Sequence, residues 1–252
     1  MEKRGQVTLF IILGIVILTV IVLVFFLRDT IVEKALGPSG TKRIISNEAD
    51  NIKDEIVKCI DEKARPALEI LGKQGGSFNP QKYRLYNGNK VNYLCYNIPN
   101  DNKCLNQMLL KSKLEAELNT YLSREIFSCI DISSFAGTTE ITTGEFKINS
   151  EIGDDGVLVN VDYPITIKKK EITQSISEFS KQVDIPLGKI VVAVNDILND
   201  EASGRGFDIV GYVKAKKSLY DISVRQPSPD KVYIVNVYGD EYKLQFAIEG
   251  GA

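Results

Sequence analysis

Histidine, the side chain that most often serves acid–base and metal chemistry, is absent from this 252-residue chain. Serine and cysteine nucleophiles are usually activated by a neighbouring base, which is most often histidine, and imidazole is also a principal zinc ligand. The sequence therefore supports none of these reaction classes. We predict no catalytic residue, no cofactor-binding residue and no metal ligand, and we expect neither an enzyme nor a cofactor.

The remaining candidates for chemistry include the four cysteines Cys59, Cys95, Cys104 and Cys129. None of them forms a Cys-x-x-Cys motif, so a zinc cluster or a thioredoxin-type site is unsupported. An even number of cysteines in an extracytoplasmic chain indicates disulfides, and four cysteines allow three pairings. Cys59 and Cys129 each lie on the apolar stripe of a predicted helix, so we infer that they bond to each other. Cys95 and Cys104 would then close a short loop; the alternative is four reduced core thiols.

Two groups of carboxylates could also do chemistry. Glu151 with Asp154–Asp155 offers hard oxygen ligands for calcium, but the spacing does not match an EF-hand loop, and an acidic turn is the favoured interpretation. Asp196 and Asp200–Glu201 could supply the carboxylate pair of a glycoside hydrolase. Nothing in the sequence places them in a cleft, and a solvated helix end is favoured.

The overall charge argues against nucleic acid as a partner. The formal net charge is −2, and the only basic run is Lys168–Lys170, which is expected at a hairpin tip. Nucleic-acid binding requires a clustered basic face.

An uncharged apolar stretch over residues 7–27 predicts a transmembrane helix, because a helix of this length spans a hydrocarbon core of about 30 Å. Lys3 and Arg4 precede it, and the positive-inside tendency places the N-terminus in the cytoplasm and residues 28 onward outside the cell membrane. The alternative is a cleaved signal peptide, but the apolar run is too long and the residues that follow it make a poor cleavage site.

The segment from Lys3 to Thr8 resembles the class III signal peptide of archaeal type IV pilin-like proteins. The resemblance implies cleavage between Gly5 and Gln6, and it covers only about the first 27 residues. The family usually carries a glutamate at the fifth mature position, where this chain has Phe10. That departure puts filament assembly in doubt.

Further along, four features resemble uncharacterised single-span surface proteins of small-genome archaea. They are Gly75-Gly76 after a cysteine-bearing helix, Cys129 in a second helix, the turn 153–155, and the strand end 161–164. This resemblance implies no assigned activity.

Apolar periodicity predicts an α+β fold. Steps of three and four residues indicate helices over 41–75, with a kink at Pro66, over 104–130 and over 186–198. Alternation indicates one or two strands over 141–148 and single strands over 83–86, 90–96, 157–167, 172–185, 207–216, 219–224, 232–238 and 242–248. Pro164 suggests an edge or a bulge. The tyrosines of the first hairpin (Tyr83, Tyr86, Tyr93, Tyr96) are either a ligand platform or, the favoured interpretation, cross-strand packing.

These elements predict four parts. Residues 1–6 form a cytoplasmic basic flank or leader, 7–27 the transmembrane helix, 28–135 a helical region with a small hairpin, and 136–252 a mostly antiparallel sheet with one inserted helix. The first functional hypothesis is a membrane-anchored extracytoplasmic structural or interaction protein without catalysis. The alternatives are a minor pilin-like filament subunit and, less favoured, a tethered surface hydrolase. The expected partners are the lipid bilayer and cell-surface proteins, with self-association through the N-terminal helix as a further option.

Overall fold

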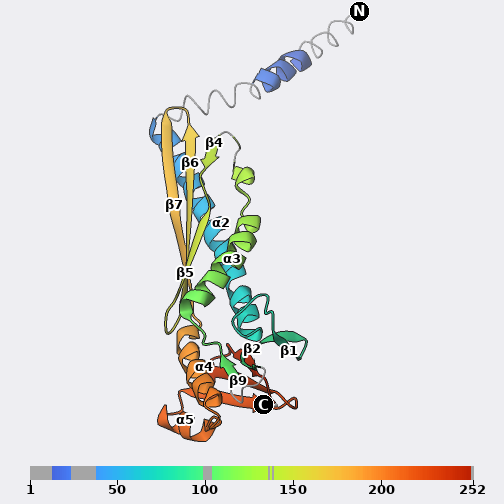
Figure 1. Cartoon of the computed structure of the whole chain (residues 1–252). Helices are drawn as coiled ribbons and strands as arrows, with labels where there is room; N and C mark the ends of the chain where they lie inside the picture. The colour runs from blue at the N-terminus through green and yellow to red at the C-terminus, as the bar shows by residue number, and fades with distance from the viewer. Residues whose placement is uncertain (1–12, 24–37, 99–103, 136, 138, 251–252) are drawn as a thin grey trace, which may run out of the picture.

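The structure is a computed structural model that describes residues 13–23, 38–98, 104–135, 137 and 139–250. It is a mixed α+β fold, as the periodicity predicts, but the strands of region 136–252 are divided between two sheets instead of forming one. Residues 13–23 are helical. In Figure 1 one sheet lies beside the long helix α2, and the other lies at the far end of that helix together with α4 and α5.

Helix α2 (Pro38–Lys73) is the longest element of the described chain. Its buried side chains recur at three- and four-residue steps and form one stripe: Ile45, Ala49, Ile52, Ile56, Cys59, Ile60, Ala64, Leu68 and Leu71. Pro66 lies inside the helix without ending it. The helix stops at Gly75 and Gly76, which take positive φ angles of 71° and 85° that favour glycine.

The four-stranded sheet is centred on β6 (Val157–Lys169). On one side β6 pairs with β7 (Ile172–Val183), and on the other with β4 (Glu140–Thr143) and β5 (Lys147–Ile152), always antiparallel. Of the two alternatives predicted at Pro164, an edge or a bulge, the structure shows the bulge, because β6 is paired on both sides and the β6–β7 register shifts between Asp162 and Ile165. The apolar face of β6 is buried, and Figure 1 shows α2 running along the β6–β7 hairpin.

The second sheet has the strand order β1-β2-β10-β9-β8, with β3 added to β2. Its strands are β1 (Tyr83–Tyr86), β2 (Asn89–Asn97), β3 (Cys104–Asn106), β8 (Tyr220–Arg225), β9 (Lys231–Val237) and β10 (Leu244–Ile248). Strands β2 and β10 pair in parallel, and the other pairs are antiparallel. The sheet therefore joins the hairpin assigned to region 28–135 with strands from region 136–252.

Two predicted elements were wrong. The strand predicted over 207–216 is helix α5 (Ile209–Ala215), so two helices, α4 (Leu187–Ala202) and α5, are inserted rather than one. Ile209, Val210, Tyr212 and Val213 are strand-forming residues, but Asp208 caps the helix by accepting a hydrogen bond from the Gly211 N–H at 3.0 Å. The helix predicted over 104–130 is β3 followed by α3 (Lys111–Cys129) and, after it, the short 3₁₀ helix Ile132–Phe135.

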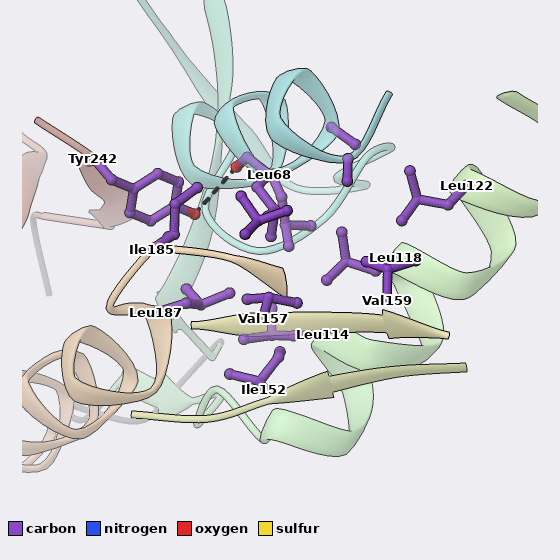
Figure 2. Packing of buried hydrophobic residues seen from close by; sticks show 14 of the residues in the cluster. Leu68, Leu114, Leu118, Leu122, Ile152, Val157, Val159, Ile185, Leu187 and Tyr242 are labelled. Carbon is purple, nitrogen blue, oxygen red and sulfur yellow. Dashed lines mark hydrogen bonds between the residues drawn. The ribbon is translucent and has the colours of Figure 1, made fainter. Parts of the chain in front are cut away.

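The core runs continuously from α2 through α3 and β6 to the second sheet. Figure 2 shows Leu68 of α2 facing Leu114 and Leu118 of α3, with Val157 and Val159 of β6 beside them. The Tyr242 hydroxyl donates to the Leu68 carbonyl at 3.1 Å, the dashed line in Figure 2, and so ties α2 to the segment before β10. Gly72 permits this close approach, because a Cβ there would lie 2.5 Å from the Lys243 carbonyl oxygen.

Candidate functional site

The cysteines form the two predicted disulfides. Cys59 of α2 bonds to Cys129 of α3 with their Cα atoms 5.9 Å apart, and Cys95 of β2 bonds to Cys104 of β3 with a Cα separation of 5.3 Å. The pairing inferred from the two apolar stripes is confirmed. No cysteine is free.

The N-terminal predictions fall mainly on residues that the structure does not describe. Gly5, Gln6 and Phe10 lie outside the described residues, and so do both ends of the predicted span 7–27. Its centre, residues 13–23, is helical and leaves apolar side chains such as Leu18 exposed. Among the residues that the structure describes, no helix combines the length and the apolar character needed to cross a membrane.

The two aspartates of the acidic turn at residues 151–155 each pair with a lysine. Asp154 accepts from Lys111 at the start of α3 at 3.4 Å, and Asp155 pairs closely with Lys189 of α4. Glu151 accepts instead from the Asn149 amide at 3.3 Å. The three carboxylates therefore face different partners, and within the described part of the chain no cluster of three acidic, cysteine or histidine side chains could hold a metal.

The carboxylates at the end of α4 are also separated by their partners. Asp196 accepts from the Tyr212 hydroxyl at 2.7 Å, and Asp200 accepts from Arg205 at 2.9 Å. Glu201 accepts from Lys231 at 2.8 Å and from the Tyr233 hydroxyl at 2.5 Å. Burial and then the hydrogen bonds to these carboxylates raise the pKa of both tyrosines. These contacts pin α4 to α5 and to β9, a structural role.

The tyrosines of the first hairpin form neither a shared platform nor a ring stack. The Tyr93 hydroxyl donates to Asp230 at 2.6 Å, while Lys82 lies over the Tyr96 ring and Lys90 over the Tyr83 ring. Among the described residues, no two rings of this set contact each other as an aromatic pair. The favoured cross-strand packing is confirmed for two of them, because Tyr86 and Tyr93 pack against a small apolar cluster of Val91, Val232 and Ala247 from β2, β9 and β10.

A groove of about 970 Å³ lies between α3, the turn that follows α2, and the segment joining β3 to α3. We call it the α3 groove and define it by the apolar side chains Phe78, Leu94, Met108, Leu109, Leu110 and Tyr121 together with the cations Lys113 and Arg124. Met108 and Leu110 are 44% and 47% exposed, which is high for large apolar side chains. The groove is therefore a concave surface with an apolar lining and a basic rim.

Hydrogen bonds to α4 and β2 hold the floor of the α3 groove in place. The Asn195 side chain of α4 accepts from the Leu109 N–H and donates to the Leu109 carbonyl, both at 2.9 Å. Gln107 donates its N–H to the Leu94 carbonyl at 2.7 Å. These bonds satisfy backbone N–H and C=O groups of a segment that has no regular secondary structure. The backbone is thereby held in a conformation that directs Met108 and Leu110 outward.

The wall of the α3 groove is an aromatic pair. Phe78 stacks on Tyr121 of α3 with ring centroids 4.1 Å apart and planes 3° from parallel. Glu117 holds Phe78 in place by accepting its backbone N–H at 2.9 Å. The same carboxylate oxygen accepts from the Ser77 hydroxyl at 3.3 Å, so it is engaged by the turn, and the lining of the groove carries two cations, Lys113 and Arg124, to this one carboxylate.

The two cations at the rim differ in their partners. Arg124 has a side chain that is 74% exposed and contacts Glu125 of its own helix at 3.2 Å. Lys113 is exposed and makes no ion pair with any residue that the structure describes.

The sequence does not predict the α3 groove, because the pattern over 104–130 predicts a helix through residues 107–110. An available signal was the run Met108-Leu109-Leu110 directly before a charged helical start, which places apolar residues off the helical stripe. Comparisons with protein-family models, with curated proteins and with solved structures find no match to this chain. The function of the protein is therefore inferred from the geometry of the groove.

Proposed function

We propose that the protein is a membrane-anchored extracytoplasmic interaction protein, and that the α3 groove binds a segment of a partner protein at the cell surface. The observation that carries the proposal is the groove itself, which is large, apolar and held rigid from behind. Exposed apolar surface of this kind marks interaction sites in proteins that otherwise bury their apolar residues. The two disulfides support an oxidising, extracytoplasmic environment.

The chemistry of the groove defines the occupant. Met108 and Leu110 offer contact to an aliphatic or aromatic anchor, and Lys113 and Arg124 offer charge to an acidic residue beside it. A partner segment with one large apolar side chain flanked by Asp or Glu satisfies both. Apolar anchors in pockets provide most of the binding energy at such interfaces, and the rim charges guide orientation and association.

The test is site-specific photo-cross-linking in the full chain in native membranes. A photoreactive residue at Met108 is expected to give one discrete adduct, identified by mass spectrometry. The same probe at Asn149, which is exposed on β5, serves as the control. Identical adducts from both positions, or none from Met108, would contradict binding in the groove.

Charge reversal sharpens the test. Lys113→Glu should weaken the Met108 adduct about tenfold or more, because it repels an acidic segment. Lys53→Glu makes the same charge change on the exposed face of α2 and should leave the adduct unchanged. The anchor is tested separately, by alkaline extraction of membranes and by the accessibility of residues 38–250 to protease added outside the cell.

A minor pilin-like filament subunit is the second candidate, favoured by the Lys3–Thr8 segment. Mass spectrometry of the native N-terminus decides on processing: a chain that begins at Gln6 supports it, and retention of residues 1–5 excludes it. Co-sedimentation with sheared surface fibres tests filament membership.

A further inference from the structure

Strand β8 (Tyr220–Arg225) is the last strand of the six-stranded sheet and pairs only with β9 among the described strands. Edge strands of this kind usually carry features that block pairing with another chain, such as prolines, bulges or inward charges. Strand β8 has no proline and pairs with β9 in an unbroken register over six residues. Its free edge is therefore a regular template for another strand.

The phase of the β8–β9 ladder determines which backbone groups face that edge. The Leu219 carbonyl accepts from the Tyr238 N–H at 2.8 Å, so position 219 points its backbone toward β9. Since hydrogen-bonding direction alternates along an antiparallel strand, the N–H and C=O groups of Ile222 and Val224 point to the free edge. No residue of the described chain supplies them with a backbone partner.

The side chains on β8 divide between the two faces of the sheet. Tyr220 and Ile222 are buried on the face that packs against α4 and α5. Asp221 and Arg225 project from the opposite face and are exposed. Neither makes an ion pair or a side-chain hydrogen bond with the described residues, so both charges are available to a partner.

We infer that β8 is a self-association edge at which a second copy of the chain pairs antiparallel, with the two-fold axis at Ser223. In this register Ile222 of each copy opposes Val224 of the other, so their outward backbone groups bond to each other. Asp221 of each copy then opposes Arg225 of the other, and two symmetric opposite-charge pairs form. If the two-fold axis lies at Ile222 or Val224 instead, the outward backbone groups still bond. Ser223 then lies opposite Asp221 or Arg225, and the charges remain unpaired.

Apolar surface beside the edge adds to the contact. A groove of about 410 Å³ lies between α5 and β8 and is lined by Val210, Val213 and Ile222, among others. Val210 is 78% exposed, the highest value among the large apolar side chains that the structure describes. In a two-fold pair both α5 helices lie on the same face of the joined sheet, so this apolar surface flanks the junction from both copies.

Disulfide trapping of the full chain in mild detergent tests the register. Ser223 lies opposite Ser223 of the second copy as a non-hydrogen-bonded pair. The Cα atoms of such a pair lie about 4.5 Å apart, a separation that a disulfide spans. Ser223→Cys should therefore give a covalent dimer under mild oxidation. Asp221→Cys is the matched control, because position 221 of one copy is offset by four residues, or about 14 Å, from position 221 of the other. All native cysteines are already bonded, so each variant adds the only free thiol.

Charge exchange supplies a second readout. Asp221→Arg and Arg225→Asp should each weaken dimerisation about tenfold, measured by sedimentation equilibrium, because each places like charges opposite one another twice. The double exchange should return the dimer to within about twofold of the wild type. Thermal unfolding of each variant checks that the fold is unchanged, as expected for exposed positions.

The outcomes separate this edge from other modes of association. Trapping at position 223 but not at 221, together with recovery in the double exchange, supports the inference. Equal trapping at both positions, no trapping at 223, or no recovery in the double exchange overturns it. Association through the N-terminal helix alone gives no trapping specific to position 223 and no weakening by either single exchange, which also overturns the inference, and none of these results depends on what occupies the α3 groove.

Discussion

The two sheets of this protein are built in opposite ways. The four-stranded sheet contains strands that follow one another in the chain, and the long α2 stripe covers its apolar face. The six-stranded sheet joins β2 to β10 across roughly 150 residues. Local pairing is fixed by turns and alternation, whereas distant pairing must be held by side chains and cross-links. The comparison indicates that the second sheet depends more on a few specific contacts.

The largest expected effect is the loss of unfolding free energy when a disulfide is removed, and the two disulfides should differ in it. The Cys59–Cys129 bond closes a loop of 70 residues and the Cys95–Cys104 bond one of 9 residues. The chain-entropy relation gives about 4 kcal/mol for the first and about 2.5 kcal/mol for the second. Paired Cys→Ala substitutions, measured by denaturant unfolding, should show this order. A larger loss from the shorter loop would contradict the entropic account.

Asp230 is the buried contact that holds the second sheet. It is 4% exposed and accepts from Arg84 at 3.1 Å, from the Tyr93 hydroxyl and from the Gly250 N–H. Asp230→Ala leaves these donors without their acceptor and should cost about 3 kcal/mol.

Hydrogen exchange would locate that loss. Amides of β2, β9 and β10 should exchange faster in Asp230→Ala while those of β6 and β7 do not. Asp50→Ala, on the exposed face of α2, should stay within about 0.5 kcal/mol of the wild type. Equal acceleration in both sheets would mean that the two do not differ in the way proposed.

Gly72 joins the two regions, because α2 approaches the segment before β10 there. An alanine methyl at this position meets the Lys243 carbonyl oxygen at 2.5 Å, a clash with the backbone. Gly72→Ala should cost about 2 kcal/mol in spite of the better helix propensity of alanine. Asn51→Ala, at an exposed position of the same helix, should be neutral or slightly stabilising; a neutral Gly72→Ala would show that the junction is loosely packed.

The smallest effect is confined to alkaline pH. Burial, together with the hydrogen bond to the Asp230 carboxylate, raises the pKa of Tyr93 to about 12 from the ordinary value of 10.0. The stabilisation from this raised pKa is complete below about pH 10, the unfolded value, and is lost as pH rises toward 12. Ultraviolet difference spectra of wild type against Tyr93→Phe measure the titration. Asp230→Asn should lower the Tyr93 pKa, and an unchanged value would assign the shift to burial alone.

The features that the sequence predicts follow the same division between local and distant pairing. The β6–β7 hairpin was predictable because Val157 to Ile167 alternate strictly and face one core. Cys59 and Cys129 were predictable as a pair because each lies on a buried stripe. The pairing of β2 with β10 was not predictable, since no local pattern in residues 89–97 indicates a partner strand about 150 residues away. Helix α5 was missed because its residues favour strands, and only the cap at Asp208 contradicts them. The α3 groove was missed because its position depends on β3, which the helical assignment removed.

The Cys59–Cys129 bond also has a mechanical consequence. A pulling force that enters through the N-terminal end of α2 reaches Cys59 and then passes through the disulfide directly to Cys129. The intervening 69 residues, which include β1, β2, β3 and most of α3, lie on a bypassed branch of the covalent chain. The α3 groove is formed mainly by this branch, so tension between the two ends of the protein does not stretch the backbone that shapes it.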